Sequence, residues 1–276
     1  MRNRLLFLLL LVFLFAHVTC GQNLDDLRKE YVGKTVLLRG LYEGDDLKFD
    51  ADGNVLGAAD GGHWATARLE VTKLDLKHHH LIVRGKRKAV AMSKDGTLHD
   101  VYQGERKDWD KGVDRLDKAI LTIAVSDRAR MAASLGKILV VDKSEWKSVA
   151  PPYWRDYLDG NNQTPSIKAG EVFRTLADGT KVYKCGGPVR CPKPIDTPDP
   201  EYSEAARKAR YMATATFEIV VDGNGRLGNI QVKKPAGMGL DENGVASLQK
   251  WRFKPAELDG KPVAVLLDVE VGWSLL

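Results

Sequence analysis

The chain has 276 residues, of which 43% are hydrophobic and 29% charged, and its net charge is +5. This composition is ordinary for a folded protein and excludes wholesale disorder, while the length allows one large or two modest domains. Because charges of both signs are mixed along the chain, the small positive excess is only a weak indication of an anionic partner, and we expect no nucleic-acid binding.

Residues 1–20 have the pattern of a signal peptide. Arg2 and Arg4 precede an apolar run from Leu5 to Ala16, and polar residues follow it. A basic start and about a dozen apolar residues are typical of a secretory signal, whereas a membrane-spanning helix needs roughly 20 apolar residues. We therefore predict export and a mature start at Gly21, with a short uncleaved membrane anchor and lipidation at Cys20 as the alternatives.

Residues 21–149 are predicted to form a β-rich domain with one or two helices. Alternating or apolar runs indicate strands at 34–42, 65–76, 81–90 and 118–125. Residues 127–141, which begin with Asp127 as a helix cap, predict a helix that turns into extended chain. These residues resemble no family that we recognise, and a small barrel, a sandwich or an open α+β sheet would all fit the pattern.

Residues 150–197 hold most of the prolines and predict an extended connector with one short hairpin in "EVFRTLADGTKVYKC". Cys185 and Cys191 lie on a Gly/Pro turn within it. Export leads to an oxidising compartment, so we predict a disulfide, worth about 2 kcal/mol for so short a loop. A metal site would need further ligands nearby, and a redox pair would normally be C-x-x-C.

Residues 198–276 predict an α+β domain with the order helix, β-hairpin, helix, strand and with a three-stranded antiparallel sheet. The second helix should begin at a capping Asp241, and the fragment "WRFKPA" should close it. In that fragment Arg252 and Lys254 are expected to point into water. The residues predicted to anchor the fold are Leu240, Leu248, Trp251, Phe253 and Pro255, the last by ending the helix.

The same residues resemble a known family. "PDPEYSEAARKAR", the run "FEIVVDGNGRLGNIQVKK", the Leu-Asp pair followed by "WRFKPA" and then "DGKPVAV" resemble, in order, the C-terminal domain of TonB-family energy transducers. The resemblance implies a periplasmic, Gram-negative adaptor that grips the TonB box of an outer-membrane transporter, with ExbB–ExbD as inner-membrane partners if the chain is anchored. A homodimer is compatible with it.

The grip implied by the resemblance is strand addition to a free sheet edge. The family uses its last strand, which is long and alternating here and contains no proline after Pro262. The predicted partner-binding edge consists of Val263, Val265, Leu267, Val269, Val271 and Trp273. Core packing of these side chains is the structural alternative.

Two departures from the family favour a second interpretation. The apolar run is short, and a predicted folded domain stands where a long Pro-rich span is usual. The alternative function is therefore an exported scaffold or interaction protein that reuses the fold without energy coupling. No catalytic, cofactor or metal motif is present in the sequence, and we expect no enzyme; His78, His79 and His80 are interpreted as a polar strand entry.

Overall fold

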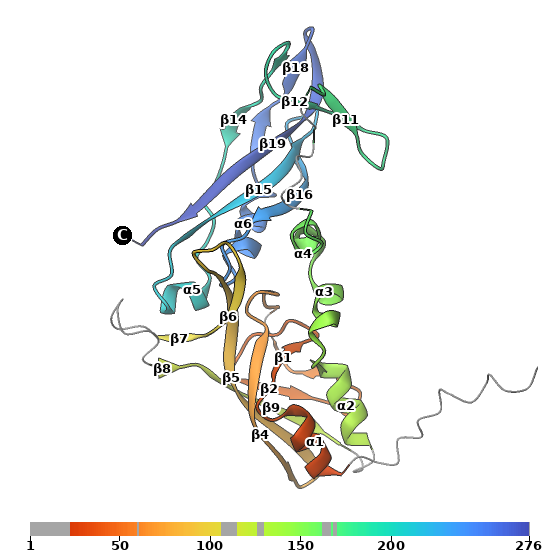
Figure 1. Cartoon of the computed structure of the whole chain (residues 1–276), viewed down its shortest axis with the longest axis vertical. Helices are drawn as coiled ribbons and strands as arrows, with labels where there is room; N and C mark the ends of the chain where they lie inside the picture. The colour runs from red at the N-terminus through yellow and green to blue at the C-terminus, as the bar shows by residue number, and fades with distance from the viewer. Residues whose placement is uncertain are drawn as a thin grey trace, which may run out of the picture.

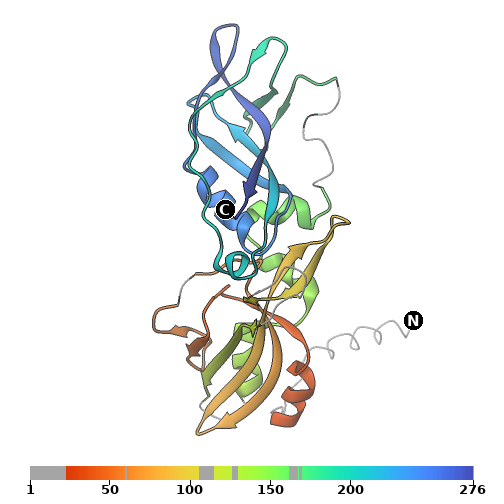
Figure 2. The same ribbon diagram turned by 90° about the vertical axis from the view of Figure 1, so that its left-hand side faces the viewer.

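The computed structural model describes residues 23–59, 61–105, 115–125, 130–161, 167 and 170–275. Its elements form an N-terminal part and a C-terminal part that follow each other along the long axis (Figures 1 and 2). The predicted signal segment with Cys20 and the cap Asp127 lie outside these residues. Among the helices that are described, none is long and apolar enough to cross a membrane.

The N-terminal part is built on one sheet with the strand order β10-β1-β4-β5-β9-β2-β3, and β6 pairs with β5. All neighbours are antiparallel except β2 and β9. Helices α1 and α2 share a core with this sheet, and β7 and β8 form a separate pair. The elements are α1 (Leu24–Tyr31), β1 (Thr35–Leu38), β2 (Asp46–Phe49), β3 (Val55–Leu56), β4 (Arg68–Lys77), β5 (His80–Met92), β6 (Leu98–Tyr102), β7 (Gly104–Glu105), β8 (Arg115–Leu116), β9 (Lys118–Ala124), α2 (Met131–Ile138) and β10 (Leu139–Val140).

The histidine run occupies a turn rather than the entry to a strand. Lys77 pairs with His80, so His78 and His79 form the two-residue connection of the β4–β5 hairpin. Both have positive φ, 43° and 64°. Two-residue hairpins favour turns in which both central residues have positive φ, because that twist matches the twist of the strands. Only His80 lies in a strand.

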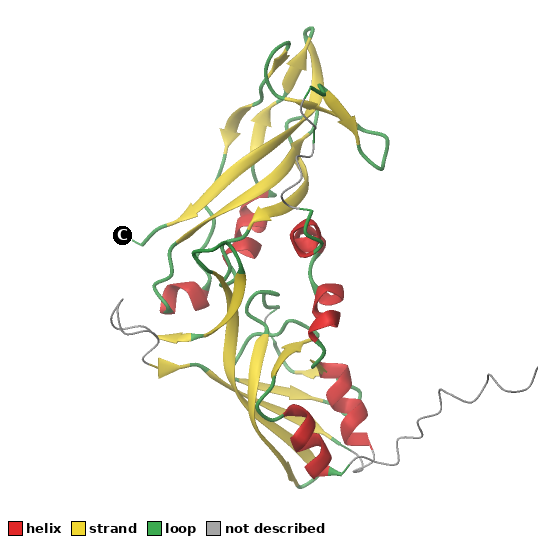
Figure 3. Cartoon of the chain, viewed as in Figure 1, coloured by secondary structure: helices red, strands yellow, loops and turns green. Residues whose placement is uncertain are grey.

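The connector contains short helices and strands, so the prediction of an extended segment was wrong (Figure 3). Trp154 is fully buried, and burial of its indole outweighs the bias of the prolines toward extended chain. The predicted hairpin is confirmed as β11 and β12. The connector elements are η3 (Pro152–Trp154), α4 (Arg155–Leu158), β11 (Phe173–Thr175), β12 (Lys181–Lys184), β13 (Val189–Arg190) and β14 (Lys193–Asp196). They are preceded by η2 (Lys143–Glu145) and α3 (Trp146–Val149).

The C-terminal part has the expected α+β class, but its sheet is larger than three strands. The order β16-β15-β19 is continued by β12 and β11 of the connector, and β18 joins β19 to β13. A separate pair joins β14 to β17. The elements are α5 (Glu204–Lys208), β15 (Ala213–Val221), β16 (Leu227–Lys234), α6 (Leu240–Leu248), β17 (Arg252–Lys254), β18 (Ala256–Leu258) and β19 (Lys261–Trp273).

Helix α6 starts and ends differently from the prediction. Its N-cap is Gly239, with φ of 79°, and Asp241 lies inside the first turn, where its carboxylate accepts bonds from Ala236 N and Gly237 N (2.8 and 2.6 Å). The helix ends at Leu248, and Pro255 separates β17 from β18 instead of stopping the helix. A short strand therefore replaces the expected last turn.

The residues predicted to anchor the fold lie in α6 or directly after it. Leu240 and Leu248 are fully buried and Phe253 is 8% exposed. Trp251 is half-buried, and its indole Nε1 donates to the carbonyl oxygen of Pro198 (3.0 Å). The two cations of the fragment, Arg252 and Lys254, are exposed as expected. The fragment thus alternates inside and outside as a strand.

Candidate partner-binding edge

Strand β19 carries the alternation that the sequence predicted. Val265, Val271 and Trp273 are buried, and Val263, Leu267 and Val269 pack against the same core. All six side chains therefore face inward, where burial holds the strand in place. What β19 can offer a partner is its backbone edge, since the unpaired N–H and C=O groups of an edge strand can pair with another chain.

One edge of β19 is paired with β15 from Val265 to Trp273. The pairing is antiparallel, from Ala213 opposite Trp273 to Val221 opposite Val265. The other edge pairs at its start with β18, where Ala256 lies opposite Val263. That pairing is a hairpin closed at Gly260. The strand's own neighbours thus leave only the later part of one edge for other contacts.

The connector occupies part of that remaining edge. Strand β12 pairs parallel with β19, with Val182 opposite Ala264, Tyr183 opposite Val265 and Lys184 opposite Leu266. The first part of the predicted edge is therefore already paired with a strand of this chain. Among the described residues no strand pairs with this edge from Leu267 to Trp273.

The opposite border of the sheet is formed by β16. The short helices η3 and α4 lie beside β16 (Figure 1). Both borders are thus flanked by the connector, one by helices and the other by a hairpin. Among the described residues, no strand pairs with β19 from Leu267 to Trp273 on the side that β12 occupies.

Helix α6 packs against the part of β19 whose backbone edge is unpaired. Gly244 lies so close to the sheet that a Cβ there would be 2.8 Å from Phe217 Cζ and 3.1 Å from Trp273 Cη2. The indole of Trp273 also donates to the carbonyl oxygen of Glu201 (3.1 Å). The free stretch is therefore held by a packed aromatic contact and a hydrogen bond, and its backbone is in place before a partner arrives.

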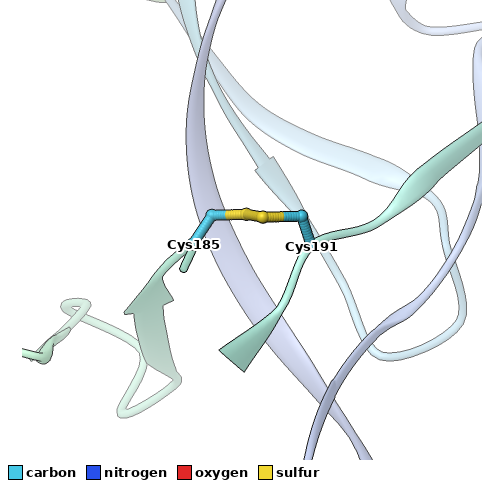
Figure 4. The surroundings of a disulfide bond; sticks show 2 residues. All are labelled: Cys185 and Cys191. Atoms are coloured by element: carbon cyan, nitrogen blue, oxygen red, sulfur yellow. A yellow bond between two sulfur atoms is a disulfide. The ribbon is translucent and has the colours of Figure 1, made fainter. Parts of the chain in front are cut away.

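The predicted disulfide between Cys185 and Cys191 is present (Figure 4), with the two Cα atoms 5.2 Å apart. Cys185 follows directly after β12, and Cys191 follows directly after β13. Because β13 pairs with β18, the bond ties the end of β12 to the hairpin that leads into β19. The covalent link keeps the connector strand close to the edge.

The N-terminal end of α6 is buried in the junction between the two parts. Glu242 Oε1 accepts from the backbone N–H of Ala65 and from Trp154 Nε1, both at 3.2 Å. Trp154 lies against Trp64, with ring centroids 5.1 Å apart, and the guanidinium of the buried Arg68 stacks over Trp64 at 4.4 Å. A polar, aromatic contact therefore fixes α6 to the N-terminal sheet.

Burial shifts the ionisation of this junction. It raises the pKa of Asp241, and the neighbouring Glu242 adds to the effect against two backbone hydrogen bonds. Burial likewise raises the pKa of Glu242, against the charge of His63. Burial acts to lower the pKa of His63, but its hydrogen bond to Glu43 and the charges of Glu242 and Glu43 raise it overall. The junction thus favours protonated groups.

Comparisons with known proteins relate the last part of the chain to one family. The family model described as "Gram-negative bacterial TonB protein C-terminal" matches residues 198–275. A curated relative named Protein TonB, from Vibrio cholerae serotype O1, is 31% identical over 77 residues, covering 28% of this chain and 32% of that protein. Residues 198–275 therefore form a TonB-type C-terminal domain.

The relatives bear on the C-terminal domain alone. The matched region spans about a third of the length of the curated relative. Among solved structures, the solution structure of the Pseudomonas aeruginosa TonB C-terminal domain is similar, at 22% identity and a TM-score of 0.27, over 37% of this chain and 94% of that one. A superposition of that quality does not bear on the arrangement of the edge.

Sequence reasoning missed two features of the site. The hairpin was expected, but its parallel pairing with β19 was not, because nothing in "KVYK" identifies the strand it adjoins. The burial of Asp241 and Glu242 was also missed. Acidic residues in the first turn of a helix normally lie in water, where they interact favourably with the helix dipole. The sequence therefore carried no signal for their burial or for the bond between Glu242 and Trp154.

Proposed function

We propose that the chain is a periplasmic TonB-like protein. Its C-terminal domain binds an extended segment, the TonB box, of an outer-membrane transporter by strand addition, in energy-dependent transport. The observation that carries this proposal is the unpaired edge of β19 from Leu267 to Trp273 in a TonB-type domain. Its role is to bind a partner and not to catalyse a reaction.

Backbone pairing is the grip in this proposal. The side chains of Val271 and Trp273 are buried and cannot be read by a partner, whereas the edge groups can pair with any extended chain. Affinity then comes mainly from main-chain hydrogen bonds, and alternate side chains of the added segment add specificity. The segment should bind in extended form and without rearrangement of α6.

N-methylated peptides test this grip. Alternate residues of an added strand turn their N–H groups toward the edge, so methyl groups on that set block the ladder, and methyl groups on the other set do not. With a synthetic TonB-box peptide and the full chain, calorimetry should show loss of binding, at least tenfold, for one set only. Equal effects of both sets, or no binding of the unmodified peptide, would contradict strand addition.

The buried junction favours a second candidate function. Glu242 bonds α6 to Ala65 of the N-terminal part and to Trp154 of the connector, so the C-terminal domain is attached to a folded N-terminal part. This arrangement is compatible with an exported scaffold protein. Its β19 edge would bind a partner or a second copy of the chain, without energy coupling. A retained N-terminal anchor would instead add the ExbB–ExbD proteins as partners.

The N-terminal residue of the mature protein separates the two candidates. Mass spectrometry that finds Gly21 as the first residue supports the scaffold, since a cleaved chain has no inner-membrane helix through which force could act. Met1 retained in the inner membrane supports the coupling role. An acylated Cys20 makes the chain a lipoprotein and counts against direct coupling.

A further inference from the structure

We infer that the β11–β12 hairpin is a removable resident strand that occupies the first part of the partner-binding edge. The inference rests on the proposed function and says which residues of β19 are available to a partner. A partner pairs with Leu267 to Trp273 while the hairpin is in place. It gains Ala264 to Leu266 only when β12 leaves.

The geometry gives β12 the position of an added strand. It forms three ladder pairs with β19, at Ala264, Val265 and Leu266, immediately before the free stretch. It comes from the connector, outside the matched residues 198–275. A partner strand that extends beyond Leu267 toward the start of β19 would meet the end of β12, because two strands cannot pair with the same edge groups.

The hairpin is attached through few buried groups. Val182 is fully buried, but β11 is largely exposed, with Phe173 at 41%. Beyond the ladder, Tyr183 packs partly buried against the core, and the Arg174 guanidinium lies 3.9 Å from the Glu218 carboxylate. The ring pair of Phe173 and Tyr183, with centroids 5.6 Å apart, lies within the hairpin itself. Elements with few buried apolar contacts open at low free energy, so this hairpin should open before the rest of the sheet.

The disulfide makes opening local and reversible. Cys185 is bonded to Cys191, next to β13. A strand tethered at such a short distance has a high effective concentration at its own site. The resident strand therefore competes with a partner at that edge, and it returns when the partner leaves. No change in the oxidation state of the cysteines is involved.

Proline substitutions test the inference in the full chain. Tyr183→Pro removes an N–H from the middle of β12 and should release the hairpin. Ala177→Pro is the matched control, because it lies at the first central position of the turn in which Gly179 N donates to Leu176 O, where proline is favoured. Hydrogen exchange is measured by mass spectrometry.

The expected result is exchange at least tenfold faster at residues 264–266 in Tyr183→Pro, with residues 213–221 and the Ala177→Pro protein unchanged. A synthetic peptide of residues 171–184, added to Tyr183→Pro, should restore protection at 264–266. Unchanged exchange at 264–266, loss of protection throughout β15, or no restoration by the peptide would each overturn the inference. None of these readouts uses a transporter peptide, so a failure of the proposed function is seen separately.

Discussion

At the residue scale, Gly244 shows how tertiary contact overrides local preference. Glycine in a helix costs about 1 kcal/mol relative to alanine, and from the sequence alone Gly244 is a weakness of α6. In the structure it allows the helix to approach Phe217 and Trp273 closely. The residue that weakens the helix therefore permits the packing that holds β19.

We predict that Gly244→Ala destabilises the protein although alanine favours the helix. The new methyl group would overlap the Phe217 ring in a packed core, and overpacking costs about 1–3 kcal/mol. Gly136→Ala in α2 is the control, because nothing lies within 4 Å of its Cβ position; it should stabilise by up to about 1 kcal/mol. Denaturant unfolding of both variants measures the difference, and stabilisation by both would refute this role of Gly244.

Trp251 and Lys254 lie on opposite sides of the fragment "WRFKPA": the first packs against the protein and the second is exposed to water. Trp251→Ala should cost about 2–3 kcal/mol, through lost packing and the lost hydrogen bond to Pro198. Lys254→Ala should be neutral or slightly stabilising, because Lys254 is exposed and lies opposite Lys193. Thermal unfolding compares the two, and equal shifts in Tm would be inconsistent with the described packing.

At the element scale, regular alternation was predictable and strand partners were not. The patterns located β1, β4, β5, β9, β15, β16 and β19, because each is an alternating or apolar run in the sequence. The end of α6 was misplaced, since "WRFKPA" alternates as a strand of three residues, too short to distinguish from a helix exit. The pairing of β12 with β19 depends on how the connector folds over the sheet.

The disulfide gives a prediction at this scale. Replacing Cys185 and Cys191 with serine should lower stability by about 2 kcal/mol, because the unfolded chain loses a constraint on a short loop. Loss of the tether also lets β12 and β13 open locally, so their amide protection should fall by more than that of residues 23–105. Hydrogen exchange with denaturant unfolding checks this, and a uniform loss of protection would argue for a global role instead.

At the scale of the whole molecule, two sequence regions that look independent pack against each other in one core. Helix α6, from the TonB-type domain, places Glu242 against Ala65 of the N-terminal part and Trp154 of the connector. Composition and periodicity gave the existence of two folded regions. They could not give the contact, which depends on which surfaces of the folded parts fit together.

We predict that stability falls as pH rises from about 5 to 8. Asp241 and Glu242 have raised pKa values in the folded state, so the folded protein binds more protons than the unfolded chain until the pH passes those values. The raised pKa of His63 acts in the same direction above about pH 6.5. Glu43, whose pKa is lowered to about 2, acts oppositely but only in acid.

Glu242→Gln tests the source of this slope. The amide keeps an oxygen for Ala65 and Trp154 but cannot ionise, so the fall in unfolding free energy between pH 5 and 8 should become shallower. Glu204→Gln, at an exposed position, should leave the slope unchanged. Urea unfolding across this pH range gives both slopes. An unchanged slope in Glu242→Gln would show that the junction is not the cause of the pH dependence.

The most direct test of the central claim is an amide-exchange footprint of the full chain with and without a transporter's TonB-box peptide. Strand addition at the open edge predicts new protection confined to residues 267–273 of β19, with β16 and the N-terminal sheet unchanged. Peptide binding without protection at 267–273, or with protection elsewhere on the molecule, would contradict the assignment of this edge as the partner site.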